Sequence, residues 1–227
     1  LQSVQNTLAE IGASYTVVRD SAGLNTATKI ILPGVGHFGQ MLRSLDALGV
    51  RNTLVDRVRK GVPFLGICLG LQALFTRSEE APELSGLGLL RGRCALLRPE
   101  RAAQEAGATN AGSDAGAGRA AEVSPTAAPR LATYAETDAR LKVPHVGWNS
   151  LTFPRASRLM ANVPDGAQVY FTHSYAAPIV DATVATTTYG TTFSAAIESD
   201  NVSAVQFHPE KSGQVGLRIL RNWLDAL

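Results

Sequence analysis

The chain has 227 residues, a formal net charge of +2 and 45% hydrophobic residues, values that are ordinary for one globular domain with its own core. Lys and Arg residues are few and scattered, which disfavours a nucleic-acid-binding face. The two cysteines, Cys68 and Cys94, are too few for a secreted disulfide scaffold. No apolar run is long enough to cross a bilayer. We therefore expect a globular protein that binds neither nucleic acid nor membrane.

The first part of the chain alternates helical and strand patterns. Helices are predicted over residues 1–12, 38–48, 52–60 and 69–75, and strands over 15–18, 29–32 and 62–67. The continuous apolar run at 62–67 is typical of a buried strand in a parallel sheet. This order favours an α/β fold with a doubly wound, mostly parallel central sheet flanked by helices.

Residues 99–140 break this pattern. Fourteen of these 42 residues are Ala, and large apolar side chains are almost absent. Such a segment cannot bury enough surface to offset its ordering entropy, so it is predicted to be a low-complexity, largely disordered surface insertion within a single domain. A regulatory or docking loop is the less favoured alternative. Short strands at 169–171, 184–189, 195–198 and 202–207 follow, and an amphipathic helix spans 213–227.

The sharpest local signal is Gly66-Ile67-Cys68-Leu69-Gly70, between a predicted buried strand and a predicted helix. A Gly-x-nucleophile-x-Gly turn forces the nucleophile into a strained conformation, and the flanking glycines avoid clashes. The thiol would lie at the carboxyl edge of the sheet and at a helix N-terminus, which favours the thiolate. Cys68 is therefore the candidate nucleophile. Cys94 has no such context and is interpreted as structural.

A candidate base stands near the end of the chain, in Gln206-Phe207-His208-Pro209-Glu210. Pro209 disfavours helix at His208, and in an extended chain positions two apart face the same way. Glu210 could therefore orient the His208 imidazole towards the thiol, as in a catalytic triad. A surface pair or half of a zinc site is the alternative. A metal is not expected, because no other histidine has a metal-ligand spacing.

Acyl chemistry at a thiolate also requires donors for the oxyanion. The backbone N–H of Leu69 is one candidate, and the loop Pro33-Gly34-Val35-Gly36 is another. An ordinary strand-to-helix turn is the alternative for this loop. The chain contains neither a complete dinucleotide-binding Gly pattern nor a phosphate-binding loop, so no nucleotide or other cofactor is predicted.

The motifs together resemble a known family. Gly-Ile-Cys-Leu-Gly-Leu-Gln (66–72) with His-Pro-Glu (208–210) is similar to the class I, triad-type glutamine amidotransferases. Three further stretches resemble the glutaminases of imidazole glycerol phosphate synthase. They are Leu-Pro-Gly-Val-Gly-His-Phe-Gly (32–39), Pro-His-Val-Gly-Trp-Asn (144–149) and Tyr-Phe-Thr-His-Ser-Tyr (170–175).

The resemblance implies a role for each matched position. Cys68, His208 and Glu210 would form the triad, with Val35, Gly36 and Leu69 at the oxyanion. The positions that match glutamine-binding residues are Gln72, Glu80, His173, Ser174 and Tyr175. The positions that match partner-facing residues are Trp148, Asn149 and Lys211. The partner would be a (β/α)₈-barrel synthase, either a separate chain or a domain fused after residue 227. It would use the ammonia in histidine biosynthesis.

The start of the chain departs from the family. Leu1-Gln2-Ser3-Val4 is typical of the inside of a helix, whereas family members begin with a strand and a Gly-Asn turn. We expect that this first strand is missing, with weaker folding and weaker coupling to the partner. The expected location is the cytoplasm, or a plastid if a leader peptide has been lost.

Two other functions stay open at this point. Another class I amidotransferase, of the vitamin B6 or anthranilate pathway, would share the chemistry but supply a different ammonia acceptor. The His-Val-Gly-Trp-Asn stretch disfavours it. A catalytically inactive binding subunit is the second alternative, and the intact Cys-His-Glu set disfavours that.

Overall fold

The computed structural model describes residues 1–98 and 141–226, so the predicted insertion at 99–140 lies outside the described residues. The helices are α1 (Gln2–Glu10), α2 (Ser21–Thr26), α3 (Phe38–Ala47), α4 (Arg51–Arg59), α5 (Leu69–Ala73), η1 (Pro209–Lys211) and α7 (Gly213–Asp225). The strands are β1 (Ile30–Gly34), β2 (Phe64–Cys68), β3 (Phe75–Ser78), β4 (Leu90–Leu96), β5 (His145–Ser150), β6 (Gln168–His173), β7 (Tyr175–Ala176), β8 (Thr183–Tyr189), β9 (Thr191–Ser199) and β10 (Val202–Val205).

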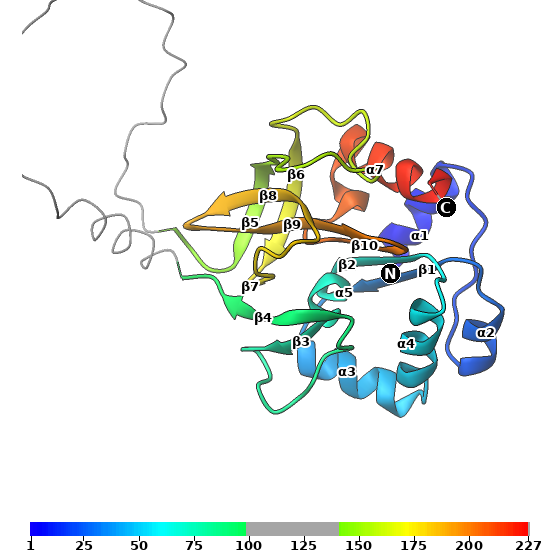
Figure 1. Ribbon diagram of the computed structural model, residues 1–227. Coiled ribbons are helices and arrows are strands. Elements are labelled where there is room, and N and C mark those ends of the chain that lie inside the picture. The colour runs from blue at the N-terminus through cyan, green and yellow to red at the C-terminus, as the bar shows by residue number, and fades with distance from the viewer. Residues whose placement is uncertain (99–140, 227) are drawn as a thin grey trace, which may run out of the picture.

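The central sheet has five strands in the order β1-β2-β10-β9-β8. β1, β2 and β10 run parallel to one another, whereas β9 is antiparallel to both β10 and β8. The predicted α/β fold is confirmed, with a sheet of mixed strand direction (Figure 1). Its parallel part is the part that carries the candidate nucleophile, at the end of β2.

Helices cover both faces of this sheet, as the doubly wound prediction requires (Figure 1). Alternate side chains of the buried strand β2 enter two different core clusters. Leu65 and Ile67 pack in the cluster that contains residues of α1 and α7. Phe64 packs in the cluster that contains residues of α3 and α4. The nucleophile strand is therefore fixed by apolar packing on both faces.

Two small sheets lie beside the central one. β3, β4 and β7 form one, and the antiparallel pair β5–β6 forms the other. The register of β5 and β6 places His145 opposite His173. The sequence analysis did not predict β3, β4, β5 or β7. β4 (Leu-Arg-Gly-Arg-Cys-Ala-Leu) alternates only weakly, because small Gly92 stands among its inward positions, and in β5 (His-Val-Gly-Trp-Asn-Ser) the large apolar residues Val146 and Trp148 are on the exposed side.

Two predicted elements are wrong, and for the same reason. In both segments the structure depends on whether another strand is available for pairing, which the local sequence pattern does not show. Residues 15–18 form no strand: Tyr15 and Val17 are exposed, and the segment has no ladder partner among the described residues. β-propensity alone does not make a strand without a neighbour to accept its hydrogen bonds. The predicted helix at 69–75 ends earlier, and Phe75 instead begins β3, which pairs with β4.

Candidate active site

Cys68 ends β2 and immediately precedes α5. Its φ of +54° is a left-handed conformation that non-glycine residues rarely adopt, as expected for a strained nucleophile turn. The flanking glycines permit the turn: a Cβ on Gly70 would lie 1.9 Å from the carbonyl oxygen of Leu32, and one on Gly66 would lie 2.7 Å from the carbonyl oxygen of Gly70. Any side chain at these two positions would therefore displace the backbone that aims the thiol.

His208 and Glu210 form a buried pair, although they are separated from Cys68 by most of the chain. The Nδ1 of His208 lies 2.8 Å from Oε1 of Glu210, and their side chains are 3% and 6% exposed. Pro209 begins η1 directly after His208, whose backbone is extended. The spacing of two residues thus places carboxylate and imidazole in contact, as the sequence predicted.

The other ring nitrogen of His208 is the one available to the thiol. Nε2 is buried and completes no hydrogen bond with a described residue. Burial lowers the pKa of His208, but the interactions with Cys68 and Glu210 outweigh burial and raise that pKa to about 9. The thiol therefore lies close enough to affect protonation of the ring, at a looser geometry than a closed hydrogen bond, as is common in sites without bound substrate.

A cavity of about 280 Å³ opens beside Cys68. Ligand pockets in proteins usually measure from about 300 to about 1,000 Å³. A cavity near the lower limit of this range suits a small metabolite such as a single amino acid. The lining residues come from the end of β2, from α5, β6 and β7, from the loops that follow β1 and β3, and from the segment just before β5. They are Val35, Gly36, Cys68, Leu69, Gln72, Glu80, Pro144, Thr172, His173, Ser174 and Tyr175. All of the predicted oxyanion and glutamine-binding positions therefore meet at one cavity, together with Pro144 and Thr172, which were not predicted.

Glu80 supplies the negative charge of this cavity. Its Oε2 accepts a hydrogen bond of 2.7 Å from the backbone N–H of Phe38, in the first turn of α3. The N-terminus of a helix carries a partial positive charge, which attracts an acidic side chain. A fixed carboxylate that lines the same cavity as the nucleophile is suited to an α-ammonium group.

The predicted oxyanion loop lies beside the nucleophile. Gly34, the last residue of β1, is in register with Cys68 of β2. A Cβ on Gly34 would lie 2.9 Å from the Cβ of Leu69, so the loop can approach α5 this closely only with glycine. The Val35 side chain is 75% exposed, and Gly36 adopts a φ of +94°. The loop contributes Val35 and Gly36 to the cavity lining.

Comparison with known proteins decides the family. The model of the family "Glutamine amidotransferase class-I" matches residues 1–227. The imidazole glycerol phosphate synthase subunit HisH of Methanothermobacter thermautotrophicus is 39% identical, over 100% of this chain and 93% of its own length. The HisH subunit of Syntrophotalea carbinolica is 42% identical, over 99% of this chain and 94% of its own length. The chain belongs to the class I glutamine amidotransferase family.

Solved structures of this family share the fold. A crystal structure of a glutamine amidotransferase superposes with a TM-score of 0.64 at 16% identity, covering 99% of this chain and 92% of that one. PurLQS from Thermotoga maritima gives a TM-score of 0.59 at 18% identity, covering 99% and 92%. At such low identity these structures bear on fold alone. The HisH relatives are the ones that place this amidotransferase among the glutaminase subunits of imidazole glycerol phosphate synthase.

A second buried pair, formed by two histidines, lies at the cavity of this amidotransferase, which His173 lines. His145 Nδ1 lies 3.2 Å from His173 Nε2, and His173 Nδ1 lies 2.9 Å from the carbonyl oxygen of Tyr175. Burial lowers the pKa of His145 to about 4. Burial also lowers the pKa of His173, to about 3, with His145 and His208 nearby adding to the effect. Both rings are therefore neutral at physiological pH.

Because His145 and His173 are buried as neutral rings, we expect the protein to lose stability in mild acid. In the unfolded chain both rings bind protons as the pH falls through about 6.5, whereas in the fold they stay neutral until about 4 and 3. The free energy of unfolding should therefore fall by about 2.4 kcal/mol per pH unit between pH 6 and 5, which corresponds to slightly fewer than two protons, about 1.75. His208 has a raised pKa, so its contribution is fully present below pH 6.5 and does not mask this fall.

Urea denaturation at pH 7, 6, 5.5 and 5 measures this slope in a range where carboxylates stay ionised. His145→Asn should lower the slope by about one proton, whereas a substitution at exposed His37 should leave the contribution of the buried pair intact. A wild-type stability that is constant from pH 7 to 5 would contradict the neutral buried pair.

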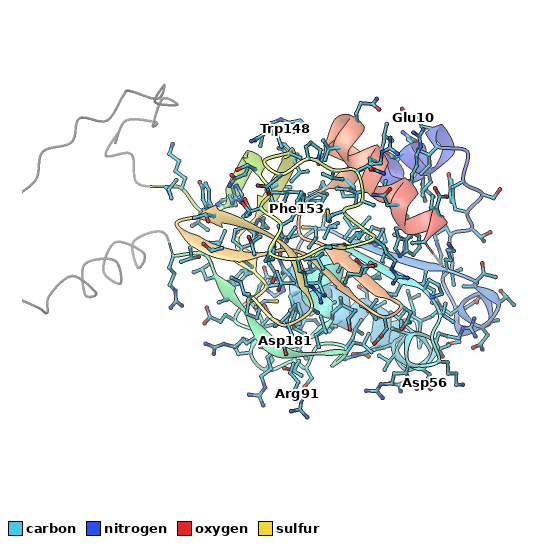
Figure 2. The ribbon with its side chains drawn as sticks, turned by 45° about the horizontal axis from the view of Figure 1, so that its top comes forward. Glu10, Asp56, Arg91, Trp148, Phe153 and Asp181 are labelled. Atoms are coloured by element: carbon cyan, nitrogen blue, oxygen red, sulfur yellow. The ribbon has the colours of Figure 1, made fainter. Side chains whose placement is uncertain are left out.

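The predicted partner-facing residues divide into two environments. Trp148 is 56% exposed on β5 and stands at the periphery in Figure 2. Its ring meets Tyr170 edge-on at 6.1 Å, and the Nζ of Lys211 lies 5.5 Å from the centre of the same Tyr170 ring. Asn149 points to the other face of β5, where its Nδ2 donates to the carbonyl of Thr188 at 3.0 Å. Trp148 and Lys211 share one surface, and Asn149 does not.

Three other expectations of the sequence analysis concern metals, membranes and Cys94. Within residues 1–98 and 141–226, no group of three His, Cys, Asp or Glu residues could hold a metal ion. None of the helices in these ranges has both the length and the apolar character needed to cross a membrane. Cys94 is fully buried, and its pKa is raised by burial and by the charge of Glu80. An inert thiol at Cys94 contrasts with the cavity-lining thiol at Cys68.

Proposed function

We propose that this amidotransferase hydrolyses glutamine to glutamate and ammonia through Cys68, His208 and Glu210. The observation that carries the proposal is the shared cavity. It joins a strained thiol with a predicted oxyanion loop and a fixed carboxylate, while a buried histidine–glutamate pair stands beside the thiol. The family supplies the reaction, and the geometry supports a role for each residue.

In this mechanism the Cys68 thiolate attacks the side-chain amide carbon of glutamine. The developing oxyanion is stabilised by the backbone N–H of Leu69 and by the loop at Val35 and Gly36. His208, held by Glu210, protonates the amide nitrogen of the substrate. Ammonia then departs, and a γ-glutamyl thioester with Cys68 remains. Water, deprotonated by His208, then hydrolyses the thioester to release glutamate and regenerate the thiol.

Glutamine is held in this proposal by the other side of the cavity. Glu80 accepts the α-ammonium group, and Gln72 presents its side chain from α5. The segment His173, Ser174 and Tyr175 lies along the α-carboxylate. A site that binds both ends of an amino acid places the amide carbon at the sulfur, which is how positioning contributes to rate.

The ammonia acceptor is proposed to be a (β/α)₈-barrel synthase that forms imidazole glycerol phosphate in histidine biosynthesis, as the names of the HisH relatives suggest. Trp148, Tyr170 and Lys211 would form an aromatic and cationic part of the docking surface, because Trp and Tyr are favoured anchors of interfaces. Trp148 is exposed, and Tyr170 beside it is partly buried. Neither nucleic acid nor membrane takes part in this proposal, and the expected cytoplasmic location stays a prediction.

Glutamate release tests the proposal. The chain is assayed with glutamine alone, with the barrel synthase, and with the synthase and its phosphoribulosyl substrate. Release should be low for the chain alone and rise by at least about tenfold in the full mixture, with stoichiometric imidazole glycerol phosphate. Release that responds instead to a synthase of the vitamin B6 or anthranilate pathway would refute the proposed partner. No release in any mixture would refute the enzyme.

A further inference from the structure

Gln206 is a fully buried side chain whose amide reaches the nucleophile. Its Nε2 lies 3.7 Å from Sγ of Cys68, within hydrogen-bond range for sulfur, and its Oε1 lies 3.2 Å from Nε2 of Gln72. The mechanism above assigns no role to this residue. It stands two positions before His208, so the same segment brings both side chains to the thiol.

The orientation of this amide follows from fixed backbone groups. A carbonyl oxygen can only accept, so the carbonyl of Tyr175 requires the nitrogen of Gln72, which lies 2.8 Å from it. The same nitrogen has a second N–H, which meets Oε1 of Gln206. Gln206 must therefore turn its oxygen to Gln72 and its nitrogen to Cys68. The oxygen and nitrogen of a glutamine amide are distinguished by their hydrogen-bond partners, and here the partners allow only this orientation.

The chain of donors continues on the other side of the Tyr175 carbonyl. His173 donates to it through Nδ1, so its Nε2 is an acceptor for the Nδ1–H of His145. The Nε2 of His145 in turn faces Nδ2 of Asn149 at 3.4 Å. Every step has one donor and one acceptor only when both rings are neutral, in agreement with their lowered pKa values.

We propose that Gln206 is a positioning residue for the nucleophile: its side-chain N–H donates to the Cys68 sulfur and stabilises the thiolate, and the hydrogen-bonded chain through Gln72 holds the amide in that orientation. A hydrogen bond to a charged acceptor is more stabilising than a hydrogen bond to a neutral acceptor. The N–H of Gln206 therefore stabilises the thiolate more than the thiol. The titratable groups around the thiol are His208, with Glu210 behind it, and the cavity-lining Glu80, His173 and Tyr175. The inference rests on the proposed role of Cys68.

The test is the pH profile for alkylation of Cys68 by iodoacetamide, with the labelled peptide identified by mass spectrometry so that Cys94 does not contribute. Gln206→Met keeps length and bulk but removes the donor. Its profile should move to higher pH by about one unit, which is about tenfold slower alkylation below both midpoints. Gln206→Glu places a carboxyl oxygen where the N–H was, and where this carboxyl is ionised its charge should move the profile further, by about two units.

Ser203→Ala is the matched control, since Ser203 is buried in strand β10 of the same segment and makes no contact with the thiol. It should keep the wild-type profile. If Gln206→Met is too unstable to purify, the shift in Gln206→Glu relative to Gln72→Met, which should move the profile less, carries the test. A wild-type profile in folded Gln206→Met would overturn the inference. Where that variant cannot be purified, a shift in Gln206→Glu no larger than the shift in Gln72→Met would overturn it.

Failure of the proposed function would look different. In that case Cys68→Ala would retain glutamate release, whatever the profiles of the Gln206 variants. If only the inference fails, glutamate release will still depend on Cys68, but the pH profile for alkylation will be the same in the Gln206 variants as in the wild-type protein.

Discussion

Replacing Cys68 with alanine is expected to reduce glutamate release by about 10⁴-fold or more, measured with the synthase partner present. The thiol is the attacking group in the proposal, and no other described nucleophile lines the cavity in the strained position that the turn at Gly66 and Gly70 creates. Stability should change little, because the substitution removes one sulfur from a site that already borders a cavity.

Cys94→Ala is the matched control. Cys94 is the other thiol of the chain and is buried away from the cavity lining, so release should stay within about threefold of wild type. Comparable release by Cys68→Ala and the wild-type protein would remove Cys68 from the mechanism, whereas equal losses in both variants would point to damage of the fold.

Glu210→Gln is expected to lower release by about 10³-fold at neutral pH, comparable in kind to removal of the orienting carboxylate from other triads. The Nδ1–H of His208 now donates to Oε1 of Glu210 at 2.8 Å. An amide at this position either donates to Nδ1, which forces the proton onto Nε2 and blocks the base, or buries an unpartnered NH₂ where Oε2 now makes no hydrogen bond. The pKa of His208 should also fall from about 9, because Glu210 helps to raise it.

Steady-state release from pH 6 to 10 measures both effects, together with titration of His208 by NMR. Glu83→Gln makes the same chemical change at an exposed side chain, and it should leave both readouts unchanged. Glu210→Asp should recover part of the activity. Release by Glu210→Gln within about threefold of wild type would exclude the orienting role.

The sequence identifies the parts of the site that depend on local backbone geometry. The turn at Cys68 follows from glycines two positions away on each side, and the His208–Glu210 contact follows from two residues in an extended segment that Pro209 keeps out of a helix. The β1, β2 and β10 strands were predictable as apolar runs, since buried parallel strands need no alternation. Each of these signals is contained within a few consecutive residues.

Other features depend on contacts that a single sequence does not show. Residues 15–18 have strand-like composition but no neighbouring strand, and β4 and β5 form because other strands are present to pair with them. Asn149 follows Trp148 in a motif, but strand alternation turns the two side chains to opposite faces. Gln206 was within reach of the same two-residue rule that linked His208 to Glu210. Its partner Gln72 and the Tyr175 carbonyl that orients Gln72, however, are distant in the sequence and are brought beside it only by the fold.

The central claim is that glutamine is hydrolysed through a covalent bond to Cys68. The most direct measurement is acid quenching of the enzyme during turnover with glutamine and the synthase, followed by peptide mass spectrometry. The account predicts a γ-glutamyl thioester on the peptide that contains Cys68, and its disappearance when glutamine is replaced by glutamate. Glutamate release without any adduct at Cys68, or with the adduct on Cys94, would contradict it.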